Sequence, residues 1–106
     1  AMVYKVAIRT QVGRFNSDIE IDINNDGTLT GNFEILNMKS TFSGRASDNN
    51  VEFTGKINTP IGELEYNAYG TIEGDDFHGI AKTRIGDFEF SPLVRRKIIK
   101  KRFETD

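Results

Sequence analysis

The segment NDGTLTGNFE, residues 25–34, joins a polar turn to an alternating segment that contains an interior glycine. Its opening residues are typical of a tight turn. The residues that follow alternate, with Leu29, Gly31 and Phe33 on one face and polar residues on the other, which predicts a β-strand. Glycine costs stability inside a strand, so Gly31 must have a structural reason.

The segment is one member of an internal repeat. DNNVEFTGKIN (48–58) and GDDFHGIAK (74–82) have the same order of polar turn, apolar residue, spacer, glycine, spacer and nonpolar residue. Their glycines, Gly55 and Gly79, continue from Gly31 at an interval of 24 residues. The chain is therefore built from a recurring unit.

The other half of the unit also recurs. TPIGELEY (59–66) and TRIGDFEF (83–90) repeat at the same interval, and TQVGRF (10–15) begins the series, shifted by one residue. Asn37 stands in the equivalent place one unit earlier, since asparagine tolerates a left-handed backbone. Two turn signals and two alternating segments per unit predict a β-hairpin.

Four such hairpins predict an all-β fold, an eight-stranded antiparallel up-and-down β-barrel. The single barrel domain covers residues 3–97, and a short basic C-terminal tail covers residues 98–106. Helical periodicity is absent before the tail. The expected strands are 3–11, 14–23, 28–36, 39–47, 51–58, 63–72, 77–85 and 87–97.

Alternation assigns the apolar residues to an inward face. They are Tyr4, Val6, Ile8, Phe15, Ile19, Ile21, Ile23, Leu29, Phe33, Ile35, Phe42, Val51, Phe53, Ile57, Leu64, Tyr66, Ile72, Phe77, Ile85, Phe88, Phe90 and Val94. The same register places small residues inward, namely Gly31, Gly44, Ala46, Gly55, Ala68, Gly70, Gly79 and Ala81. Small inward residues either keep a coiled sheet narrow or leave room inside, and the aromatic rings can fill that room.

Composition bounds the function classes. A chain of 106 residues without cysteine is one domain with no disulfide, thiol nucleophile or thiolate ligand. No apolar run reaches the length of a membrane helix, and the N-terminal AMVYKVAIRT lacks a signal-peptide core, so we expect a cytoplasmic protein. The net charge is −2, yet RRKIIKKR (95–102) holds six of the fourteen basic residues. This tail can contact the acidic body, an anionic membrane surface or an acidic partner.

NDGTLTGNFE resembles the second hairpin of the avidins, in which a turn precedes leucine, a polar residue, glycine and an aromatic strand. With the eight-stranded meander, this likeness implies a calycin-like barrel of the lipocalin, fatty-acid-binding-protein and avidin type. The tryptophans of avidin-like biotin sites and the lipocalin Gly-x-Trp signature are absent. The TPIG and TRIG segments are also similar to bacterial β-barrel modules of unknown activity.

The polar motifs do not assemble into a catalytic group. His78, the only histidine, is expected to point outward, and no nucleophile, base and orienting group are spaced together, so we expect no enzyme activity. DINNDG (22–27) matches the start of a calcium loop, but Phe33 stands where the loop needs glutamate. Asp75 and Asp76 occupy a turn of the repeat. Tyr69 is the only outward strand aromatic, which disfavours nucleic-acid binding. No cofactor is implied.

The leading hypothesis is a non-enzymatic barrel that binds a small hydrophobic ligand in its interior. The expected ligand contacts are Tyr4, Phe33, Phe42, Phe53, Tyr66, Phe77 and Phe90, with Tyr4, Thr10, Ser17, Tyr66 and Thr83 as orienting polar groups. The alternative is a solid-core interaction or oligomerisation module, with a homodimer left open, that acts through its exterior or its basic tail.

Overall fold

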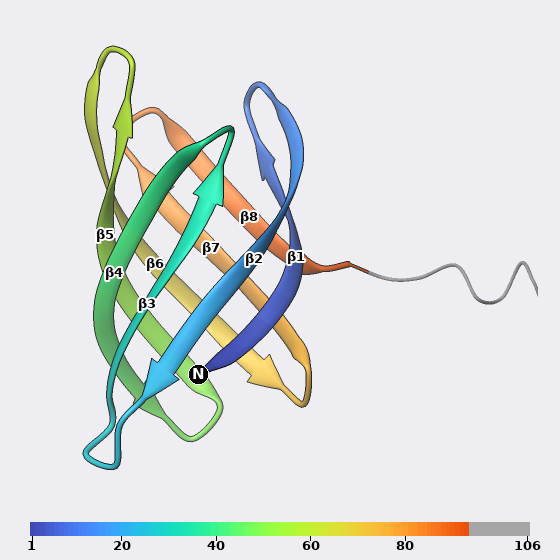
Figure 1. Cartoon of the computed structure of the whole chain (residues 1–106), viewed down its shortest axis with the longest axis vertical. Coiled ribbons are helices and arrows are strands. Elements are labelled where there is room, and N and C mark those ends of the chain that lie inside the picture. The colour runs from blue at the N-terminus through green and yellow to red at the C-terminus, as the bar shows by residue number, and fades with distance from the viewer. Residues whose placement is uncertain (94–106) are drawn as a thin grey trace, which may run out of the picture.

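The computed structural model of the chain describes residues 1–93, which form one closed β-barrel (Figure 1). Its strands are β1 (Met2–Thr10), β2 (Gly13–Ile23), β3 (Thr28–Ile35), β4 (Met38–Ser47), β5 (Asn50–Thr59), β6 (Gly62–Glu73), β7 (Asp76–Thr83) and β8 (Gly86–Pro92). Neighbours in sequence pair antiparallel, and β8 closes on β1. The predicted eight-stranded up-and-down barrel is confirmed. The predicted tail, residues 98–106, and the end of the last predicted strand lie outside the described residues.

Each of the four hairpins has one two-residue turn, and all four turns lie at the same end of the barrel. In three of them a threonine hydroxyl donates to the carbonyl oxygen of the closing glycine, at 2.6–3.0 Å, and accepts the N–H of the residue before that glycine. Thr10 and Thr83, predicted as orienting groups of the interior, instead close these turns. In the fourth turn Leu36 and Asn37 have φ of 50° and 65°, which confirms the left-handed asparagine.

The inward register is confirmed for most of the predicted core. The buried apolar residues form one cluster. Phe15 and Ile72 are half-buried at its margin. The prediction is wrong for Ile23 and Ile85, which are exposed: Ile23 is the last residue of β2, and Ile85 lies in the turn between β7 and β8, at the opposite end of the barrel. Val94 lies outside the described residues.

The glycines of the repeat lie where aromatic rings press against the sheet. A Cβ atom on Gly31 would meet the ring of Phe42 and the carbonyl oxygen of Glu20. At the equivalent positions Gly55 and Gly79, a Cβ atom would lie 2.8 Å and 2.9 Å from a ring carbon. Because glycine has no side chain, each of these positions leaves room for a neighbouring ring. The rings fill the interior space that the small inward residues would otherwise leave open.

Strands β2 and β3 diverge toward the hairpin end of the barrel. Their pairing spans only Glu20–Ile23 of β2 and Leu29–Asn32 of β3. Beyond it the Ser17 hydroxyl donates to the carbonyl oxygen of Glu34 at 2.8 Å, so a side chain replaces the backbone ladder. Ser17, predicted to orient an interior ligand, thus bridges the two strands where they separate.

Candidate functional site

The seven aromatic residues predicted to contact an interior ligand form one connected cluster. All seven are buried. The centroids of contacting rings lie 4.0–6.4 Å apart, and the closest pair is Phe42 stacked on Phe53. Phe33, Phe53 and Phe77 each contact three other rings. The rings therefore contact one another and occupy the middle of the barrel; their role toward a ligand stays a prediction.

A single polar pair lies within this core. The Ser40 hydroxyl donates to the carbonyl oxygen of Lys56 at 2.9 Å and lies 2.6 Å from the Tyr66 hydroxyl. Because serine has one hydroxyl proton, Tyr66 donates to Ser40. Burial raises the pKa of Tyr66 to about 12, and the hydrogen bond with Ser40 opposes that rise. Sequence reasoning missed Ser40, although its place two residues before Phe42 in an inward register marks it.

An apolar pocket opens at the hairpin end of the barrel. Its volume is about 220 Å³. The Thr10 and Thr59 hydroxyls at its edge are already bonded within their turns. All four hairpins contribute apolar lining residues: Val12, Phe15, Ile35, Leu36, Met38, Ile57, Leu64, Ile85 and Phe88. We call this pocket the mouth; it presents hydrocarbon almost throughout.

The four turns around the mouth each expose one aliphatic side chain. The exposed fractions are 82% for Val12, 60% for Leu36, 98% for Ile61 and 61% for Ile85. We call these four residues the apolar rim. Sequence reasoning missed it, although the signal was present: alternate turns of a meander lie at the same end, and three of the turns repeat the order threonine, any residue, valine or isoleucine, glycine.

The opposite end of the barrel is acidic. Each of its three turns contains one aspartate, Asp26, Asp48 or Asp75, and no lysine or arginine. In the calcium-like segment the Asp26 carboxylate accepts hydrogen bonds from the Thr28 hydroxyl and N–H, at 2.7 Å and 3.0 Å, which lower the Asp26 pKa. Residues 1–93 bring together no group of three His, Asp or Glu side chains that could hold a metal ion. Asp26 therefore closes a hairpin turn.

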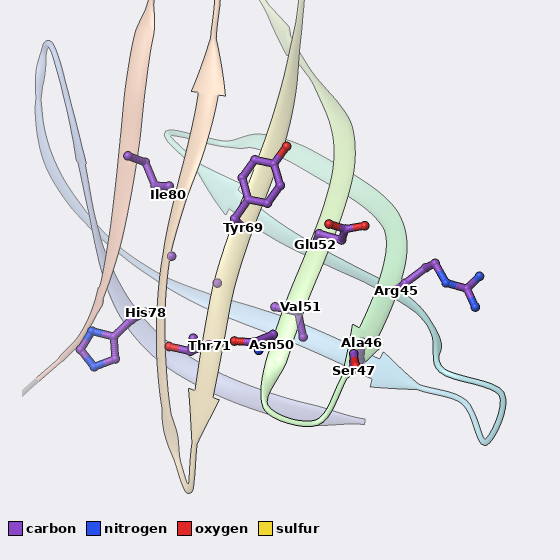
Figure 2. A pocket seen from close by; sticks show the side chains of 12 residues that line it. Arg45, Ala46, Ser47, Asn50, Val51, Glu52, Tyr69, Thr71, His78 and Ile80 are labelled. Carbon is purple, nitrogen blue, oxygen red and sulfur yellow. The ribbon is translucent and has the colours of Figure 1, made fainter.

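A second hollow, of about 700 Å³, lies on the outer surface over β4–β7 (Figure 2). Tyr69 stands on its floor and is half exposed, as predicted for the outward strand aromatic. Figure 2 shows His78 and Glu52 on different sides of Tyr69, with the imidazole turned away from it. His78 belongs to the β6–β7 ladder through its backbone, and within residues 1–93 no hydrogen bond reaches its imidazole. The His78 imidazole and the Glu52 carboxylate therefore lie apart in this hollow and do not form a pair.

Comparisons with known proteins add no assignment. No protein-family model, no curated protein and no solved structure matches the chain. In the part of the chain that the structure describes, no helix is long and apolar enough to cross a bilayer.

Proposed function

We propose that the protein is a non-enzymatic, calycin-like barrel that binds a small hydrophobic molecule at its mouth. One observation carries the proposal: all four hairpins contribute apolar side chains to a single pocket of about 220 Å³ at one end of the barrel. A concave apolar pocket of this kind is the ordinary form of a small-molecule site.

The mouth is a better ligand site than the middle of the barrel. A ligand among the central rings would have to displace side chains that already contact one another, such as Phe33 and Phe90 with centroids 5.4 Å apart. The mouth is open, and Phe15 and Met38 on its wall are only half-buried. Binding there covers apolar surface without disrupting the core.

The volume limits the ligand. The mouth is larger than the roughly 150 Å³ cavity that admits benzene and smaller than the roughly 300–1,000 Å³ sites of drug-sized molecules. Its lining offers few polar partners and no charged side chain. A compact, uncharged aromatic or aliphatic group therefore fits, either as a whole molecule or as the end of a longer one.

Titration with the uncharged fluorophore N-phenylnaphthylamine tests the proposal. Its emission should rise and saturate with wild-type protein. Met38→Trp adds bulk to the mouth wall and should weaken binding at least tenfold, whereas Tyr69→Ser, on the outer surface, should leave binding unchanged. Equal affinity for the wild type and Met38→Trp would contradict a site at the mouth.

The filled core supports a second candidate function, an interaction or oligomerisation module that acts through its exterior or its basic tail. The observation that favours it is the continuous contact among the seven central rings. Sedimentation of the full chain and of a variant lacking residues 95–106 tests the tail version. It predicts that the full chain self-associates and that the truncated variant does not. The same oligomeric state for both proteins would contradict it.

A further inference from the structure

We infer that the apolar rim docks the barrel, mouth first, onto the surface of an anionic lipid bilayer. The inference concerns the same end of the barrel as the proposed ligand site, but it does not depend on a ligand. Ile61, the most exposed member of the rim, does not line the mouth. Docking and ligand binding can therefore be separated by substitution.

The rim side chains are held outward by the structure of their turns. The N–H groups of Val12, Ile61 and Ile85 each donate to the threonine hydroxyl that closes the same turn, at 3.1–3.3 Å. The two-residue turns leave these side chains no strand against which to fold. Four aliphatic groups exposed at one end of a small domain are an uncommon arrangement, and they mark a contact surface.

Charge makes this end suited to an anionic surface. The turn residues of the rim include no aspartate or glutamate, and Arg84 lies in one of them. Arg14 lies just after another, whereas Lys39 faces Glu34 across β3 and β4. Neither Arg14 nor Arg84 takes part in an ion pair within residues 1–93. Their guanidinium groups are therefore available to lipid phosphates or carboxylates.

The acidic residues near the rim are opposed by lysines. Glu34 faces Lys39 in the β3–β4 register, Glu63 lies 3.8 Å from Lys56, and Asp87 lies 3.8 Å from Lys82. At the far end of the barrel the turns hold aspartates without any basic residue. The barrel thus has an apolar, cationic end and an acidic end, and an anionic surface attracts the first and repels the second.

The shape of the rim favours lipid over a second protein surface. Figure 1 shows the four tips ending at different heights, with the β5–β6 tip extending farthest and the β3–β4 tip least. The exposed fractions of Ile61 and Leu36 follow the same order. A protein partner would need a surface complementary in shape to these uneven tips. The rim also lacks the aromatic side chains that dominate protein interfaces. A bilayer interface adapts to each tip and takes aliphatic groups directly.

The absence of tryptophan from the chain gives a direct positional test. Ile61→Trp and Ile23→Trp place one fluorophore at the rim and one at the acidic end. On addition of vesicles of phosphatidylcholine with phosphatidylserine, the emission of Ile61→Trp should shift to shorter wavelength, and brominated phosphatidylcholine should quench it. Ile23→Trp should show neither effect. Equal responses from both variants, or none from either, would overturn the docking geometry.

Cosedimentation of the full chain with the same vesicles measures the affinity. Val12→Ser/Ile61→Ser should lower the partition coefficient about tenfold, since two apolar side chains no longer enter the interface. Ile23→Ser removes a comparable aliphatic group at the other end and should have no effect. If the rim variant binds as well as the wild type, the basic tail accounts for binding and the inference is wrong.

Two further outcomes are informative. A wild type that fails to bind these vesicles overturns the inference. So does rim-dependent dimerisation without lipid, which would assign the rim to a second copy of the chain. Met38→Trp separates docking from ligand binding, because it should still bind vesicles while losing N-phenylnaphthylamine. Failure of the ligand site alone would leave docking intact.

Discussion

Replacing Gly31 by alanine is the sharpest test of how the interior is packed. The Gly31 backbone does not have the positive φ that would exclude alanine. In an open interior the substitution would therefore stabilise the barrel by about 0.5–1 kcal/mol, because alanine restricts the unfolded chain more than glycine does.

The structure predicts the opposite sign. The new methyl group would meet the ring of Phe42 and the carbonyl oxygen of Glu20 on the neighbouring strand. The ring cannot swing away freely, because it is buried and stacked on Phe53 at 4.0 Å. Overpacking of this kind costs about 1–3 kcal/mol, and a backbone obstacle places the cost toward the upper part of that range. We expect a net loss of about 2 kcal/mol, or about 10 °C in Tm.

Urea unfolding followed by far-ultraviolet circular dichroism measures the loss. Ser43→Ala, an exposed outward position on β4, serves as the control and should change the free energy of unfolding by less than about 0.5 kcal/mol. Phe42→Leu removes the obstructing ring, so Gly31→Ala should cost about 1 kcal/mol less in that background than in the wild type. A Gly31→Ala protein as stable as the wild type would refute the packed-interior account.

Three other expectations can be checked with the same unfolding assay. Ser40→Ala should cost about 1–3 kcal/mol, because it leaves the buried Tyr66 hydroxyl without its partner, and adding Tyr66→Phe should recover part of the loss. The raised pKa of Tyr66, about 12 against 10.0 for an ordinary tyrosine, means that its contribution to stability is complete below pH 10 and is lost as pH rises toward 12; spectrophotometric titration should show a phenol that ionises near pH 12 and is absent in Tyr66→Phe. Thr59→Val removes the hydroxyl that bonds the turn and the Ile61 N–H, and it should cost about 1 kcal/mol; Thr54→Val, exposed on the same strand, should cost less, and an equal cost would contradict the turn's role.

The outline of the barrel was predictable because its signals are local. Alternation around Leu29, Gly31 and Phe33 and the turn chemistry of the threonine–glycine segments define strands, faces and hairpins within a few residues. The same alternation failed at Ile23 and Ile85, since it assigns a face but does not show where the barrel ends. It also did not identify Ser40 as a core residue. A pattern of apolar residues does not reveal a small polar side chain whose hydrogen bonds are all made inside the barrel.

Turn residues and alternation were enough to predict eight antiparallel strands, their order around the barrel and most of the inward-facing residues. That the inward rings, such as Phe42 against Gly31, fill the middle and leave the open space at the mouth became clear only from the packing in the folded barrel. Turns and alternation depend on neighbours in the chain. Residual volume depends on how side chains from distant strands pack together in three dimensions.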